Sequence, residues 1–112
     1  MTALFAIPST SYLVRTTALA FAARGDQVHV CDVDEDALGR LASEQPQIGT
    51  TVCDVADEGA VTQLFETATR GFGGLDVLVN NAGIAGPIAP VEDVDLPGWR
   101  RCLAVNLEAA FL

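Results

Sequence analysis

Apolar and polar positions follow two different periods along the chain, and these periods predict its elements. Short apolar runs that stop at acidic or turn-forming residues indicate buried strands, whereas apolar residues recurring every three or four positions indicate helices. Strands are expected at 2–7, 27–32, 48–53 and 75–79, and helices at 11–24, after Asp34, after Asp57, and from Pro97 to the end of the chain. Strand and helix therefore alternate, which is typical of βαβ units in a parallel sheet.

Right-handed crossovers between such units favour the strand order 3-2-1-4, with helices on both faces of the sheet. The fold class expected is thus α/β, a doubly wound parallel sheet. The chain has 112 residues, which is enough for one domain over residues 1–112. The fourth strand, Leu75 to Val79, is almost entirely apolar and stops at Asn80, which predicts a strand buried on both faces.

Acids and glycines mark the expected helix ends. Asp34 and Asp57 precede apolar helical stripes and are expected to cap them. Gly25 is expected to end the first helix, and Gly71, Gly73 and Gly74 are expected to end the third.

The last helix carries one polar residue on its predicted apolar stripe. Pro97 suits the first helical position, and the stripe comprises Trp99, Cys102, Asn106 and Ala110. An amide on such a stripe needs hydrogen-bond partners. Asn106 is therefore either a core asparagine bonded to backbone or a site residue that holds a water molecule.

Charge and hydropathy narrow the classes of partner. The net charge is −9, and all six basic residues are arginines, which argues against nucleic acid and anionic membranes as partners. The early uncharged run Thr2–Val14 is too short to span a bilayer. The first 25 residues are rather apolar, but they begin with no basic region and Arg15 interrupts them, so no secretory leader is expected.

The cysteines and the single histidine show no metal-binding spacing. Cys31, Cys53 and Cys102 form no CxxC motif, and reduced thiols in a cytoplasmic protein are the expectation. Cys31 and Cys53 end neighbouring predicted strands, so a disulfide between them stays open as an alternative. His29 lies inside a strand and is expected to be structural.

Polar residues stand at three predicted strand ends: Asp32, Asp54 and Asn81. Because parallel strands end at one edge, these side chains are expected to line a single crevice. A carboxylate at Asp32 can accept both ribose hydroxyls of an adenosine, and Val33 offers no cation for a 2′-phosphate. NAD is therefore favoured over NADP, unless Asp32 merely helps to cap the next helix. Asp54 could accept the adenine amino group, with Val55 packing on the ring, or it could be a solvated turn acid.

Several segments together resemble the amino-terminal half of the short-chain dehydrogenase/reductase family, over about residues 15 to 112. The matching segments are Asn80-Asn81-Ala82-Gly83, Cys53-Asp54-Val55, the acid Asp32, the run from Thr17 to Gly25, and Trp99 with Val105-Asn106-Leu107 and Phe111. The resemblance implies a truncated Rossmann-like fold and hydride transfer between NAD(P) and a small-molecule alcohol or carbonyl substrate. It also implies a homo-oligomeric parent enzyme.

The same resemblance assigns roles to particular residues. Asn106 corresponds to the asparagine of the family's catalytic Asn-Ser-Tyr-Lys set. The residues implied around the adenosine side of the cofactor are Asp32, Asp54, Val55, Asn81, Ala82, Gly83 and Val105.

Two departures from the family pattern predict a chain that is inactive alone. The family places three glycines after its first strand so that backbone amides approach the pyrophosphate, and here those positions are Pro8, Tyr12 and Val14. The family's Tyr-x-x-x-Lys has no counterpart, because the chain contains no lysine. We therefore expect a fragment of an oxidoreductase that binds NAD poorly.

Two other classes of function compete with this interpretation. A non-catalytic half-domain that binds a nucleotide or forms dimers would share every feature above except the chemistry. A phospho-receiver domain also has acids at strand ends, but it needs a lysine in its site. The chain contains no lysine, which argues against this class.

Overall fold

The computed structural model describes residues 1–6 and 12–112, and the side chains of 1–4 and 15–112. Pro8, Tyr12 and Val14, which replace the family's glycines, therefore lie outside the described side chains. Strands β1 (Thr2–Ala6), β2 (Gln27–Asp32), β3 (Gly49–Val52) and β4 (Val77–Asn80) form one parallel sheet in the order β3-β2-β1-β4. This confirms the predicted fold class and strand order.

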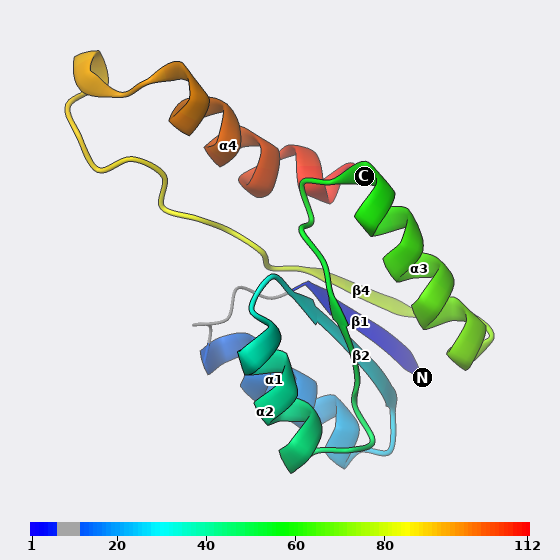
Figure 1. The fold of residues 1–112 in the computed structure, drawn as a ribbon. Helices are drawn as coiled ribbons and strands as arrows, with labels where there is room; N and C mark the ends of the chain where they lie inside the picture. Colours follow the sequence, from blue (N-terminus) through cyan, green and yellow to red (C-terminus); the bar gives the residue numbers. More distant parts are fainter. Residues whose placement is uncertain (7–11) are drawn as a thin grey trace.

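Helices cover both faces of the sheet (Figure 1). On one face α1 (Tyr12–Ala23) and α2 (Glu35–Glu44) enclose a core, and on the other α3 (Glu58–Phe72) encloses a second core. The first core contains the buried residues Ala3, Ala18, Val28, Val30, Leu38, Leu41 and Ile48. The second contains Leu4, Cys31, Cys53, Val61, Leu64 and Ala68. Alternate residues of β1 and β2 thus serve opposite faces, as the period of a strand requires.

The helix caps follow the sequence closely, because capping is a local interaction. Asp34 accepts a hydrogen bond from the Ala37 amide at 2.8 Å, and Asp57 accepts one from the Ala60 amide at 2.9 Å. Gly73 ends α3 in the left-handed conformation, with φ of 73°. Contrary to the expectation, Gly71 does not end the helix, because it lies inside α3.

Strand β4 is not buried on both faces, which corrects the expectation from its apolar sequence. Within the described residues it pairs only with β1, so it forms one edge of the sheet. Leu78 is 45% exposed, and Val77 and Val79 are half-buried. The apolar run alone could not reveal this, because burial depends on what covers the strand.

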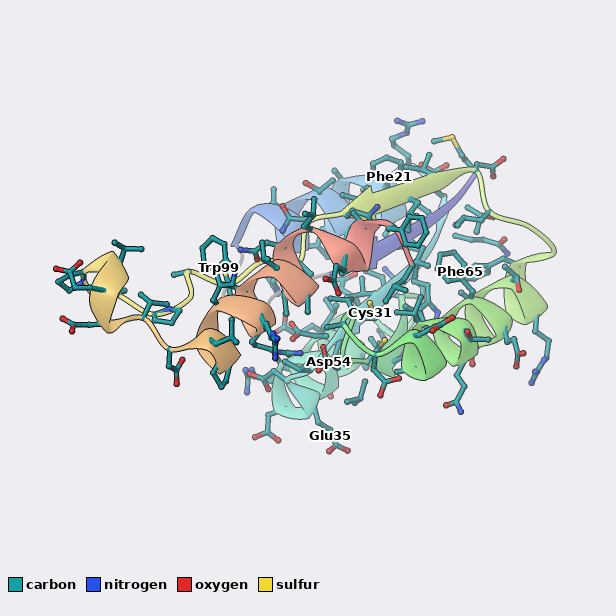
Figure 2. All side chains as sticks on the ribbon, turned by 90° about the horizontal axis from the view of Figure 1, so that it is seen from above. Phe21, Cys31, Glu35, Asp54, Phe65 and Trp99 are labelled. Carbon is teal, nitrogen blue, oxygen red and sulfur yellow. The ribbon has the colours of Figure 1, made fainter. Side chains whose placement is uncertain are left out.

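Helix α4 (Leu96–Asn106) extends away from the body of the molecule with its preceding loop (Figure 1). Its first residue is Leu96 and Pro97 is its second, with Asp95 as the cap that accepts from the Gly98 amide at 2.8 Å. The predicted buried stripe is wrong in part, because Trp99 is 53% exposed and Val105 is the buried residue of this helix. Figure 2 shows Trp99 out on this projecting helix.

The helix also ends earlier than expected, at Asn106. Leu107 leaves the helical conformation, and a 3-10 turn, η2 (Glu108–Ala110), follows. This turn places Ala109 and Leu112 around one apolar groove with side chains of α3 and β4. No helix in the described part of the chain is long and apolar enough to cross a membrane.

His29 is a buried structural residue, as expected. It is 6% exposed, shares a hydrogen bond of 2.8 Å between its Nε2 and Thr51 Oγ1, and meets the Phe72 ring edge-on at 6.0 Å. Burial lowers its pKa, since the charged imidazolium would lose its hydration. Cys31 and Cys53 are both buried, and no disulfide joins them.

Candidate functional site

The predicted site residues follow the carboxyl ends of the strands, which the sheet register aligns. Asn80 pairs with Ala6, Ala6 with Cys31, and Cys31 with Thr51, so the four strands reach the same row together. Asp32 lies one residue beyond this row. The Cys53 amide donates to the Asp32 carbonyl at 2.8 Å, which sets the ends of β2 and β3 side by side. The carboxyl ends of the four strands thus lie along one edge of the sheet.

Asp32 is held in the turn between β2 and α2. It is 3% exposed, and its Oδ1 accepts a hydrogen bond from the Asp34 amide at 3.1 Å. Burial raises the pKa of this carboxyl, the amides of Asp34 and Val33 partly oppose that, and the Asp34 charge adds to it. Asp32 therefore supports the turn into the helix, while Asp34 is the cap itself. No salt bridge joins Asp32 to a cation in the described parts of the chain.

Asp54 is fixed from two sides. Its Oδ2 lies 2.9 Å from Nη1 of Arg101, and its Oδ1 accepts from the Ala56 amide at 3.0 Å. Burial alone would raise the pKa of Asp54, but the hydrogen bond from Arg101, the Ala56 amide and the Arg101 charge outweigh it and lower the pKa. Asp54 is thus an ionised, paired carboxylate and not a merely solvated turn acid. Figure 2 shows it beside α4.

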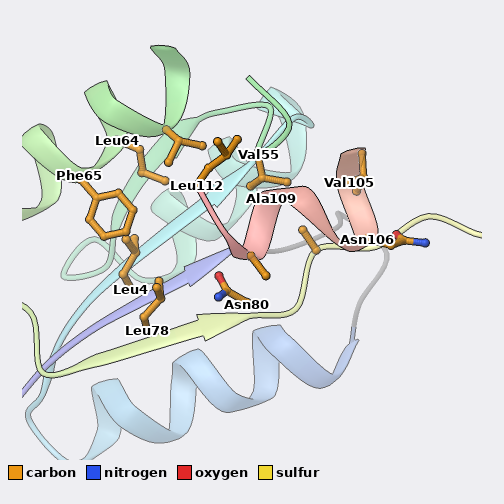
Figure 3. A pocket seen from close by; sticks show the side chains of 13 residues that line it. Leu4, Val55, Leu64, Phe65, Leu78, Asn80, Val105, Asn106, Ala109 and Leu112 are labelled. Carbon is orange, nitrogen blue, oxygen red and sulfur yellow. The ribbon is translucent and has the colours of Figure 1, made fainter. Parts of the chain in front are cut away.

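Asn106 joins α4 to the loop after β4. Its Oδ1 accepts from the Ile84 amide at 2.8 Å, and its Nδ2 donates to the Ile84 carbonyl at 2.9 Å. The expectation of a stripe position in the core is wrong, because Asn106 is exposed and its amide points away from the apolar groove (Figure 3). Asn106 is therefore bonded to backbone, as one of the two alternatives predicted, but it lies at the surface and not in the core. Its Nδ2 also lies 3.3 Å from the Cys102 Sγ.

The Asn-Ala-Gly turn packs closely on this asparagine. Asn81 and Ala82 are half-buried and Gly83 is exposed. A Cβ at Gly83 would lie 3.4 Å from Asn106 Oδ1, which is van der Waals contact.

Val55, Ala82 and Val105 line an apolar groove of about 80 Å³ between β4, α3 and the C-terminal turn (Figure 3). Val105 is 6% exposed, so it anchors the end of α4 in this groove. Asn80 is a polar group among the apolar side chains of the wall. The other lining residues are Leu4, Val61, Leu64, Phe65, Leu78, Asn106, Ala109, Ala110 and Leu112.

Sequence reasoning missed two participants, Arg101 and the Ile84 backbone. Arg101 is one of six arginines, and its pairing with Asp54 joins residues far apart in sequence. No local pattern reports such a contact. The described residues contain no group of three His, Cys, Asp or Glu side chains placed to hold a metal ion.

Sequence comparison finds similar proteins among dehydrogenases and reductases. The family model described as "Enoyl-(Acyl carrier protein) reductase" matches residues 12–112. "Short chain dehydrogenase/reductase dpmpG" of Macrophomina phaseolina (strain MS6) is 39% identical over 105 residues, covering 89% of this chain and 60% of that protein. "Cis-4-hydroxycyclohexanecarboxylate dehydrogenase" of Sinomonas cyclohexanicum is 40% identical over 99 residues, covering 86% of this chain and 40% of that protein.

Solved structures of reductases and dehydrogenases share the fold of this chain. A 3-ketoacyl-(acyl-carrier-protein) reductase from Brucella melitensis, complexed with NADH, superposes with a TM-score of 0.88 at 28% identity, over 99% of this chain and 46% of that chain. An NAD⁺-bound xylitol dehydrogenase gives a TM-score of 0.86 at 32% identity, over 98% of this chain and 44% of that chain. The chain therefore spans between 40% and 60% of the length of these relatives.

Proposed function

Because this chain belongs to the short-chain dehydrogenase/reductase family, we propose that it supplies the adenosine-binding half of an oxidoreductase that transfers hydride between NAD and an alcohol or carbonyl substrate. The observation that carries the proposal is the pair of carboxylates at adjacent strand ends. Asp32 ends β2 and Asp54 follows β3, at the edge where ligands bind in open parallel sheets.

The chemistry of these residues fits the adenosine part of a nicotinamide cofactor. Asp32 would accept ribose hydroxyls, and Asp54 would accept the adenine amino group with Val55 and Val105 as apolar neighbours. Asn81, Ala82 and Gly83 would form the opposite wall, where small side chains permit close approach. When bound, the nicotinamide gives or accepts a hydride.

NAD is proposed over NADP on electrostatic grounds. The charge of Asp34 acts on Asp32, and that charge is also negative. A 2′-phosphate would add a third negative group to this corner of the molecule. The two relatives with bound cofactor named above carry NADH and NAD⁺, which supports the same choice.

We propose that Asn106 links the loop after β4 to helix α4. Its side chain oxygen and nitrogen are already engaged by Ile84, so it fixes α4 relative to the turn after β4. A general acid or base would have to come from elsewhere, because the chain contains no lysine and its single tyrosine is Tyr12. We therefore propose that these 112 residues bind cofactor weakly and do not turn over substrate alone.

A second candidate is a nucleotide-binding or dimer-forming half-domain without catalysis, favoured by the same lack of lysine. Nucleotide binding without turnover by a longer parent protein would favour this candidate over the oxidoreductase. The cytoplasm is the proposed location, supported by Cys31 and Cys53, which form no disulfide.

An NMR titration tests the adenosine site, since the chain is small at 11.7 kDa and the method detects weak binding. ADP-ribose should shift the amide signals near Asp32, Asp54 and Gly83 and leave those of the exposed α2 surface around Gly39 unchanged. Shifts confined to other surfaces would overturn the proposed site. An assay of reduced-nicotinamide absorbance with secondary alcohols and carbonyls should show no turnover.

A further inference from the structure

Helix α4 is held at the carboxyl edge of the sheet by polar contacts to both outer strands. Arg101 reaches Asp54, which follows β3, and Asn106 reaches Ile84, which follows β4. These strands lie at opposite ends of the order β3-β2-β1-β4. The second half of the helix therefore lies at the edge at which the proposed cofactor would lie, and Figure 1 shows this end of α4 above the strand ends.

Apolar packing secures only the last part of this helix. Val105 is buried, but Leu96 and Trp99 are 55% and 53% exposed, so the amino-terminal turns have little contact with the body. The Arg101–Asp54 pair lies one turn before Val105, with a separation of 2.9 Å between Nη1 and Oδ2. It thus connects the middle of α4 to the segment that follows β3.

The same pair also orients the carboxylate. Arg101 donates to Oδ2 while the Ala56 amide donates to Oδ1, so the plane of the carboxylate is set from two directions. Each carboxylate oxygen can accept two hydrogen bonds, which leaves acceptor positions for a further donor. An adenine amino group is such a donor, and it would meet an oxygen whose position is already fixed.

We propose that Arg101 is a positioning residue for the adenine end of the cofactor: it holds Asp54 in the orientation that accepts the adenine amino group and keeps α4 over the end of β3. This inference rests on the proposed function. Arg101 acts through Asp54 and through the helix. Removing it should therefore weaken the binding of adenine nucleotides selectively and leave ligands that lack adenine unaffected.

The experiment compares two half-cofactors by NMR titration: 5′-AMP, which carries the adenine, and nicotinamide mononucleotide, which does not. Arg101→Ala should weaken AMP binding about two- to fivefold, the scale of a partly exposed ion pair, and leave nicotinamide mononucleotide unchanged. Arg101→Lys should restore most of the affinity, because the charge is kept. The matched control is Arg100→Ala, the exposed neighbouring arginine, which should bind AMP as the wild type does.

A double-mutant cycle identifies the route through Asp54. In an Asp54→Ala background, Arg101→Ala should have no further effect on AMP binding. Equal losses for Arg101→Ala and Arg100→Ala, or equal losses for both half-cofactors, would overturn the inference. The signal dispersion and the emission of Trp99, the chain's single tryptophan, verify that each variant is folded.

The outcomes also separate this inference from the function beneath it. If the wild type binds AMP and Arg101→Ala binds it equally well, the role of Arg101 is overturned but the adenosine site stands. Absence of AMP-induced shifts around Asp54 in the wild type overturns the proposed adenosine site, and the role of Arg101 with it.

Discussion

Asn106 and Ile84 are joined by two hydrogen bonds although they lie 22 residues apart in the sequence. The side-chain amide of Asn106 pairs with both the amide and the carbonyl of Ile84, at 2.8 and 2.9 Å. One polar side chain thus supplies hydrogen-bond partners for both the N–H and the C=O of Ile84 in the loop after β4. This link fixes the distance between the turn after β4 and the end of α4.

Removing this link should destabilise the chain. Asn106→Ala loses both hydrogen bonds, and because the site is exposed, water replaces part of them, so we expect a loss of about 1 kcal/mol in the free energy of unfolding. Urea denaturation measures this value. Asn106→Asp keeps the acceptor for the Ile84 amide but sets a carboxylate oxygen against the Ile84 carbonyl, so it should not recover the lost stability. Stability equal to that of the wild type in Asn106→Ala would contradict a structural role for the link.

Asp32 should determine the choice between NAD and NADP. Asp32→Ala should narrow the preference for NAD by about 1.5–3 kcal/mol, since hydrogen bonds to a charged acceptor are lost and repulsion of a 2′-phosphate is relieved. The ratio of the two dissociation constants, measured by NMR titration, reports the change. Glu35→Ala, which removes a nearby exposed acid, is the control and should leave the ratio unchanged. Equal wild-type affinity for both cofactors would rule the assignment out.

His29 should make stability depend on pH in the mildly acidic range. Burial lowers its folded pKa below the unfolded value of about 6.5, so the unfolded chain binds more protons below that pH. Its contribution is therefore present above about pH 6.5 and is lost as the pH falls. Its neighbours Thr51 and Phe72 carry no charge that could favour the imidazolium.

The substitution His29→Gln isolates this effect, because glutamine can hydrogen-bond to Thr51 but does not titrate. Urea denaturation at about pH 7 and about pH 5 should show a smaller fall in stability for the variant than for the wild type. Parallel pH profiles for the two proteins would show that other groups, such as the Asp54 carboxyl, whose pKa is lowered in the folded chain, control the loss of stability in acid.

Gly49 should be intolerant of a side chain for steric reasons. A Cβ at this position would lie 2.5 Å from the His29 Nδ1, in a buried part of the sheet. Gly49→Ala should therefore destabilise by about 1–3 kcal/mol, the usual effect of overpacking. Gly39→Ala is the matched control: it lies in α2, with nothing within 4 Å of its Cβ, and should stabilise slightly. Combining Gly49→Ala with His29→Ala should recover part of the loss if the clash is the cause.

The open edge of β4 should make the isolated chain associate. Leu78 is 45% exposed on a strand that pairs on one side only among the described residues, and such edges template further pairing. Size-exclusion chromatography should show oligomers, and Leu78→Lys should shift the protein toward monomer. A sharp monomer peak with cooperative melting for the wild type would count against this prediction.

The sequence by itself determined the features that depend on local interactions and on the handedness of connections. The caps at Asp34 and Asp57 follow from a side chain bonding three residues ahead, and the strand order follows from right-handed crossovers. The bounds of β2 match the prediction because an alternating run ends there in an acid.

Only the tertiary structure decided which of the candidate residues have partners and which are covered. The pairing of Arg101 with Asp54, the bonding of Asn106 to Ile84 and the exposure of Leu78 all depend on segments distant in sequence. Periodicity reports how a side chain is oriented on its own element, but it does not report what lies opposite. A stripe or an apolar run therefore predicts a face, and the packing of other elements decides whether that face is buried.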